Sequence, residues 1–167
     1  MRTARLPALV ALVVAVGLLA AGPAGASVSQ RRAPRLATEV CESMVREAVE
    51  AVVAHPLPTQ QVGAWTVPDK QYQCTYDVGG GTLVMQVDVE RNGKGAKTAF
   101  RTARSAFATR ERLHGIGQQA FQTPDGTLVA RKDNFVLRVD PAAVPAGINK
   151  RDVAFAAAVA VMSCWPG

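Results

Sequence analysis

The sequence contains little of what a hydrolytic or acid–base active site needs. Its only two histidines, His55 and His114, stand beside residues that interrupt regular structure, Pro56 and Gly115 respectively. The metalloprotease pattern HExxH and the hydrolase pattern GxSxG are absent, and no cysteine–histidine pairing is recognisable. We therefore expect a non-enzymatic protein without a cofactor. A hydrolase whose site has no recognised motif is the less favoured alternative.

Cysteine is also scarce, and its spacing excludes the common metal and redox motifs. The three residues, Cys41, Cys74 and Cys164, are separated by 33 and 90 positions. Zinc and dithiol sites place cysteines only a few residues apart, so we expect no metal site. In an oxidising compartment, an odd number of cysteines indicates one disulfide and one remaining thiol.

The sequence has one long apolar run, near its N-terminus. Residues 6–21 carry no charge and follow a basic start with Arg2 and Arg5. A membrane-spanning helix needs about 20 apolar residues, and this run is shorter. Alanines at positions 24 and 26 occupy the two sites that signal peptidase recognises. We expect residues 1–26 to be a signal peptide cleaved after Ala26, and the secreted remainder to contain no transmembrane helix.

Periodic patterns after the predicted cleavage point indicate an α+β domain. Residues 27–37 are polar and basic, which predicts a flexible lead-in to a single domain over residues 38–167. Apolar residues recur at helical spacing in three segments, which predicts helices over residues 38–54, 95–109 and from Asn149 onward. Two segments alternate between apolar and polar residues, which predicts strands over residues 71–77 and 82–90. Three further short strands are predicted over residues 119–123, 127–131 and 135–139, separated by the turn sequences Asp125-Gly126 and Asp133-Asn134.

The order α-β-β-α-β-β-β-α predicts an antiparallel sheet of about five strands packed with three helices. Residues 56–69 show no period and contain three prolines, so we expect a loop there, with Trp65 covering the core. Residues 113–117 are predicted to be a break between the second helix and the three-stranded meander.

Several short motifs resemble an uncharacterised family of small secreted proteins and lipoproteins from actinobacteria. They are Cys41 in the first helix, CTY at Cys74, HGIGQQAF at residues 114–121 and LVARKDNFVLRVD at residues 128–140. The resemblance covers about residues 38–165 and implies a PsbP-like α/β/α sandwich. Many members are lipid-anchored, but this sequence has no cysteine directly after the apolar run to accept a lipid. The function of the family is unassigned, so the resemblance implies no catalytic residue.

The predicted elements favour one disulfide pairing. Cys41 lies on the apolar face of the first helix, and Cys74 alternates inward with Tyr72 and Tyr76. We therefore predict a Cys41–Cys74 disulfide, which would hold down the long proline-rich loop between them. Cys164 extends the apolar face of the last helix, so a Cys41–Cys164 disulfide is the alternative.

Positive charge is concentrated in one segment. Residues 91–112 contain seven basic residues and one acidic residue, whereas the rest of the sequence after position 26 contains ten basic and twelve acidic residues. Lys97, Arg101 and Arg104 recur at helical spacing, which predicts a basic stripe opposite the apolar face of the second helix. This stripe is our candidate anion-binding site, and an ordinary solvated helix face is the alternative interpretation.

The expected partners follow from charge and export. Outside the cell, a basic stripe could bind an anionic cell-wall polymer, lipid head groups or an acidic protein. Nucleic acid is not expected, because the protein is predicted to be exported and few aromatic residues flank the stripe. Inhibition of a secreted protease is the alternative function, although the candidate inhibitory loop at residues 56–69 contains no cysteine.

The first prediction concerns processing of the N-terminus. We expect the secreted protein to begin at Ser27, because alanines occupy the two small-residue sites before it. Mass spectrometry of the culture medium measures the mass and the N-terminal peptide directly. Recovery of only an unprocessed chain in the membrane fraction would contradict the prediction.

Overall fold

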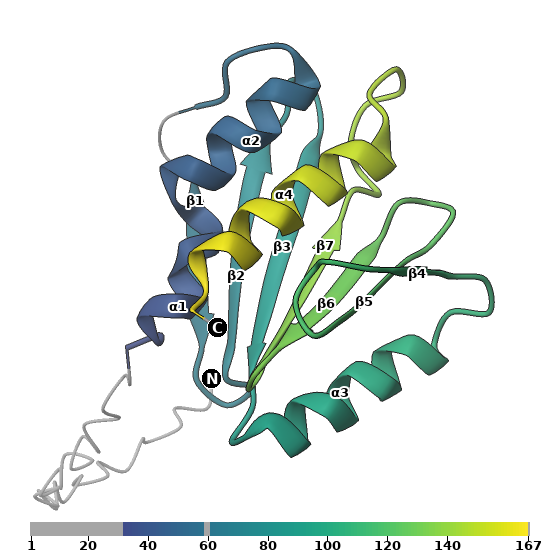
Figure 1. Ribbon diagram of the computed structural model, residues 1–167. Helices are drawn as coiled ribbons and strands as arrows, with labels where there is room; N and C mark the ends of the chain where they lie inside the picture. Colours follow the sequence, from purple (N-terminus) through teal and green to yellow (C-terminus); the bar gives the residue numbers. More distant parts are fainter. Residues whose placement is uncertain (1–31, 59–60, 167) are drawn as a thin grey trace, which may run out of the picture.

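The computed structural model describes residues 32–58 and 61–166, and the predicted signal peptide therefore lies outside the described residues. Within them, seven strands form one antiparallel sheet in the order β1-β2-β3-β7-β6-β5-β4 (Figure 1). The strands are β1 (Val62–Thr66), β2 (Gln71–Asp77), β3 (Thr82–Val89), β4 (Glu111–Leu113), β5 (Gln119–Gln122), β6 (Leu128–Lys132) and β7 (Phe135–Asp140).

Helices lie on both faces of this sheet. Helices α2 (Ser43–Val53) and α4 (Lys150–Cys164) pack side by side on one face, while α3 (Gly93–Ser105) packs on β6 and β7. Alternation along β6 separates the two layers, because Leu128 and Ala130 belong to the main core and Val129 belongs to a smaller cluster with α3. The α+β class, the antiparallel sheet and three main helices are thus confirmed.

The predicted number of about five strands is wrong, because the sheet has two further strands, one at each edge. Strand β1 forms within the segment predicted to be a loop, and it pairs antiparallel with β2 from Val62 to Thr66. Strand β4 overlaps the predicted break and pairs with β5 over three residues. Neither strand has a clear alternating pattern of its own, since each is ordered mainly by pairing with its neighbour.

The first predicted helix is also divided differently. A four-residue helix, α1 (Arg35–Thr38), and a 3₁₀ turn, η1 (Glu39–Cys41), come before Glu42, whose extended backbone separates them from α2. The predicted flexible lead-in to residue 37 therefore extends too far, because α1 already begins at Arg35.

Hydrogen bonds from distant elements explain this division. The Trp165 indole donates to the carbonyl of Leu36 over 2.8 Å, and the Tyr76 hydroxyl donates to the carbonyl of Val40. These contacts dock the first turns on the sheet and on the end of α4, which favours short, separately oriented turns over one straight helix.

The other helices begin close to the predicted positions. The Asn92 side chain accepts a hydrogen bond from the backbone of Gly95 and caps α3, which ends at Ser105, earlier than predicted. The Asn149 side chain accepts hydrogen bonds from the backbone of Arg151 and Asp152, and the predicted start of α4 is thereby confirmed. Among the described residues, we find no helix with the length and apolar character needed to cross a bilayer.

The predicted Cys41–Cys74 disulfide is present and joins η1 to β2, with a Cα–Cα distance of 5.6 Å. Cys164 is a free thiol, so the alternative Cys41–Cys164 pairing is not formed. Its sulfur lies 3.4 Å from the sulfur of Met44. Burial, reinforced by the carboxylate of Glu39, raises the pKa of the Cys164 thiol, which disfavours the reactive thiolate at neutral pH.

The second prediction concerns this disulfide. Replacing Cys41 and Cys74 by alanine should lower the free energy of unfolding by roughly 3–4 kcal/mol, because the bond closes a loop of 33 residues in the unfolded chain. Urea denaturation measures the loss. The matched control is Cys164→Ala, which leaves the disulfide intact and should cost much less. Equal losses in the two variants would contradict the structural role of the bond.

The third prediction concerns the close approach of β1 to the disulfide. A Cβ atom on Gly63 would lie 2.1 Å from the Tyr72 hydroxyl oxygen and 3.2 Å from the Cys41 sulfur. Gly63→Ala should therefore destabilise the protein by about 1–3 kcal/mol through overpacking. Adding Tyr72→Phe removes the nearest atom and should restore part of the loss, measured by urea denaturation. A Gly63→Ala variant as stable as the parent would contradict the position of β1.

Candidate anion-binding site

The three residues of the predicted stripe lie along one flank of α3, and we call them the basic strip. Lys97, Arg101 and Arg104 are all exposed, and helical geometry places them within about 60° of one another around the axis. None of the three side chains forms an ion pair or hydrogen bond with another described residue. The pattern predicts that the strip lies directly opposite the buried face of α3. In the structure it lies closer to that face, because Arg104 lines a pocket together with the buried Phe100.

The basic strip ends at a cavity of about 220 Å³ between α3, the segment that enters β4, and β5. We call this cavity the arginine pocket. Its lining residues are Phe100, Arg104, Arg110, Arg112, Gln119, Ala120 and Phe121. Three arginines from one short stretch of sequence, residues 104–112, therefore line one small hollow together with two buried phenylalanines.

The alternation of β4 explains why the pocket is basic. Arg112 pairs with Phe121 across the β4–β5 ladder, whereas Glu111 pairs with Gln122. Directly opposed residues share a face of the sheet, so Arg112 lies on the same side as the ring that packs against α3. Glu111 lies on the other side, where its carboxylate forms an ion pair with Arg151 of α4.

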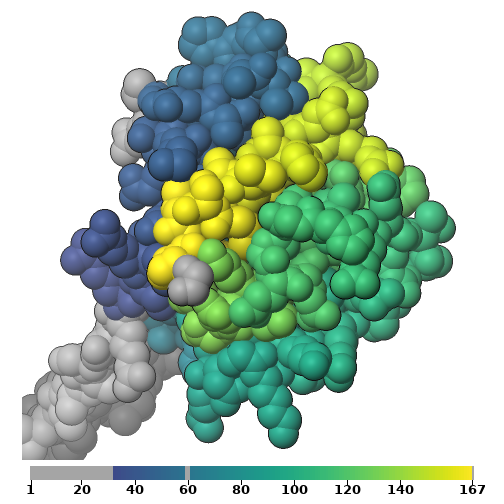
Figure 2. All heavy atoms as spheres, viewed as in Figure 1, coloured from purple at the N-terminus to yellow at the C-terminus, as the bar shows by residue number. Residues whose placement is uncertain are grey.

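Figure 2 shows this other side, where α4 forms a band at the surface between α2 and the green segment that includes β4. The Gln122 side chain donates to the backbone carbonyl of Arg151 over 2.9 Å, which ties β5 to the start of α4. The only acidic residue of the basic segment is thus neutralised away from the arginine pocket.

The pocket arginines differ in how they are held. The Arg110 guanidinium donates to the carbonyls of Phe107 and Ala108, just beyond the end of α3. The guanidinium groups of Arg104 and Arg112 have no hydrogen-bond or ion-pair partner among residues 32–58 and 61–166. They therefore keep their donors free for a ligand.

Local sequence patterns indicate only part of this site. Arg104 lines the pocket as well as the strip, whereas Lys97 and Arg101 extend the basic surface along α3 without lining the pocket. Arg110 and Arg112 belong to the charged segment, but no local pattern marks them as site residues. Their place at the pocket follows from the β4–β5 register, which no local pattern in the sequence reveals.

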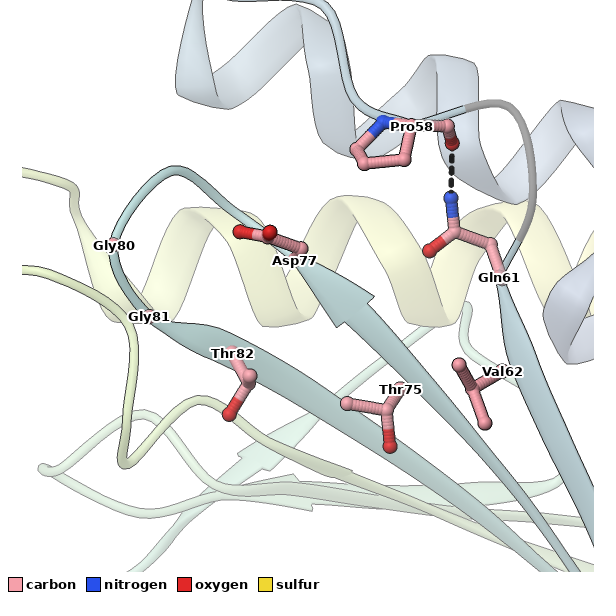
Figure 3. Close-up of a pocket in the computed structure, with 8 residues that line it drawn as sticks. All are labelled: Pro58, Gln61, Val62, Thr75, Asp77, Gly80, Gly81 and Thr82. Atoms are coloured by element: carbon pink, nitrogen blue, oxygen red, sulfur yellow. Dashed lines mark hydrogen bonds between the residues drawn. The ribbon is translucent and has the colours of Figure 1, made fainter.

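A second hollow lies on the opposite half of the sheet, over the face of β1–β3 that α3 leaves uncovered. This cavity of about 400 Å³ is shown in Figure 3, where the side chains of Val62, Thr75 and Thr82 point out from three neighbouring strands. Among the described residues that line it, Asp77 is the only charged one, and its side chain accepts a hydrogen bond from the backbone of Gly79. A hollow with a carboxylate and no cation does not favour an anion, so it does not belong to the basic site.

Neither histidine is among the residues that line the arginine pocket. His55 contacts the backbone carbonyls of Pro56 and Val78 at 3.1 and 3.2 Å, and these contacts attach the end of α2 to the β2–β3 turn. His114 is exposed after β4. No group of three histidine, cysteine or acidic residues in the described part of the chain is placed to hold a metal ion.

Comparisons with known proteins do not assign the chain to a family. The resemblance to the actinobacterial family and the PsbP-like topology therefore stay predictions. No protein-family model matches the sequence, and no curated protein or solved structure is significantly similar to it.

Proposed function

We propose that this protein is an exported, non-enzymatic binding domain that adheres to anionic cell-envelope material through the basic strip and the arginine pocket. The observation that carries the proposal is the separation of charge around β4. The basic segment has seven cations and one carboxylate, and that carboxylate is paired with Arg151 on the opposite face of the sheet.

Export is supported by the disulfide between Cys41 and Cys74. Such bonds persist in oxidising compartments and are rare where thiols are kept reduced. The predicted signal peptide, cleaved after Ala26, accounts for delivery to such a compartment, and it remains a prediction from the sequence.

The chemistry of the surface favours an anionic polymer as partner. Guanidinium groups bind oxyanions through a planar fork of donors, and exposed cations spaced along a helix act together on a repeating anion. Lipid head groups and acidic proteins present the same charge and are alternative partners. Exposed charges are screened over about 8 Å at physiological salt, so binding should weaken steeply as salt rises.

The two alternative functions receive less support. The segment proposed for protease inhibition contains β1, which is paired with β2 over Val62–Thr66 and therefore is not a free loop. A hydrolase would need a nucleophile or base at its site, and the residues lining the arginine pocket include no serine, cysteine, histidine or carboxylate.

The fourth prediction tests adhesion through the strip. Replacing Lys97, Arg101 and Arg104 together by glutamine should reduce retention on isolated cell wall by roughly 100-fold, since each of the three cations near an anionic surface contributes about 1 kcal/mol and about 1.4 kcal/mol is a factor of ten. The variant should fold normally because all three side chains are exposed.

The matched control removes three charges elsewhere, by replacing Arg31, Arg32 and Arg35 with glutamine. At each concentration of a salt series, retention of this control variant should differ little from retention of the parent protein. If the two triple variants lose equal retention, binding follows net charge alone and the strip has no special role.

A further inference from the structure

We propose that the arginine pocket is a discrete site for a phosphoryl group that carries an apolar or ring-shaped substituent. This inference rests on the proposed function, because it names the ligand class for the same basic surface. It adds selectivity, since the strip attracts any anion whereas the pocket has a defined shape and lining.

The three cations of the pocket favour a ligand group with more than one negative charge. Arg104 comes from α3, Arg112 from β4 and Arg110 from the segment that joins them, so three arginines line one cavity. A phosphate monoester carries about −1.5 to −2 charges at neutral pH and three strong acceptor oxygens. A carboxylate supplies a single charge and two oxygens, and therefore leaves more of the positive charge unpaired.

The pocket is large enough for one chemical group of a ligand but not for a whole ligand. Its volume of about 220 Å³ is smaller than the roughly 300–1,000 Å³ of sites that enclose complete small molecules. The phosphoryl group and the part of the ligand attached to it would enter, while the remainder of the ligand would lie outside.

The base of the pocket accounts for the expected substituent. Phe100 is 4 % exposed and Phe121 is 2 % exposed, and their ring centroids lie 5.5 Å apart in an edge-to-face arrangement. These rings provide an apolar surface for a substituent next to the phosphoryl group.

Gln119 adds a neutral donor to the lining. Its side-chain oxygen accepts a hydrogen bond from the Arg131 guanidinium over 3.3 Å. The oxygen is thereby occupied, and the amide NH₂ has no partner among the described residues. This group can donate to a phosphoryl oxygen, which an acidic residue at the same position could not do.

The test uses the full secreted chain and phenyl phosphate as the probe, with calorimetry to measure binding. We expect saturable binding with one site per chain. Benzoate should bind about tenfold more weakly because it offers fewer charge-assisted hydrogen bonds. Inorganic phosphate should also bind more weakly than phenyl phosphate, because it makes no contact with the phenylalanine base.

Two single substitutions, each of which removes one positive charge, show whether phenyl phosphate binds in the pocket or elsewhere on the basic surface. Arg112→Gln should weaken phenyl phosphate binding by about tenfold or more, since it removes a charge-assisted contact. Lys97→Gln changes a residue of the strip that does not line the pocket. It should change binding by less than about twofold, because Lys97 makes no direct contact with a ligand in the pocket and its charge is screened over about 8 Å at physiological salt. Arg104→Gln serves as a second pocket variant, should the first fail to fold as judged by urea denaturation.

Phosphoryl groups occur both on soluble or polymeric esters and on phospholipids, and vesicles of phosphatidylglycerol distinguish these sources. If Arg112→Gln weakens vesicle binding, the head group enters the pocket. If Lys97→Gln weakens vesicle binding and Arg112→Gln does not, the lipid head group binds the strip only. The ligand of the pocket is then a phosphate ester that is not part of a bilayer.

The inference would be overturned if phenyl phosphate fails to saturate, if benzoate binds equally well, or if the Arg112 and Lys97 variants lose equal affinity. Cell-wall retention, measured in parallel, separates this failure from that of the proposed function. Retention that persists without phenyl phosphate binding rejects only the selective pocket, whereas loss of both rejects anion binding by this surface.

Discussion

The basic surface depends on how α3 is attached to the sheet. A separate cluster of five buried side chains makes this attachment: Ala96, Phe100, Phe121, Val129 and Val136. Burying one phenylalanine stabilises a protein by about 1.5–3 kcal/mol. Like charges at helical spacing on the strip repel by only about 0.2–0.5 kcal/mol per pair. The apolar contact therefore outweighs the repulsion, and the fold can keep several cations close together without nearby carboxylates.

The register of β4 is the second constraint, and it acts on only three residues. A shift of one residue in the pairing with β5 would turn every side chain of β4 to the opposite face of the sheet. Glu111 would then lie beside Phe121 in the pocket, and Arg112 would face Arg151. The ion pair between Glu111 and Arg151 opposes such a shift, so an interaction on the α4 side supports the charge of the pocket on the α3 side.

Residue patterns predicted the parts of the fold in which local preference and packing agree. Strands β2 and β3 alternate clearly because each has one face in the core, and the same alternation placed Cys74 inward for its bond with Cys41. The edge strands were not predicted because their order comes from pairing with a neighbour. Strand β1 illustrates this, since its sequence VGAWT does not alternate between apolar and polar residues. Arg110 and Arg112 were missed as site residues for the same reason, since their proximity to Arg104 arises from contacts between α3, β4 and β5.

Strand β4 places its two charged side chains, Glu111 and Arg112, on opposite faces of the sheet. Nuclear Overhauser measurements on the isotope-labelled protein can check this placement, because they report which side chain lies next to the Phe121 ring. We expect cross-peaks from the Phe121 ring to the Phe100 ring and to the side chain of Arg112. Cross-peaks from the Phe121 ring to Glu111 in place of Arg112 would contradict the register of β4.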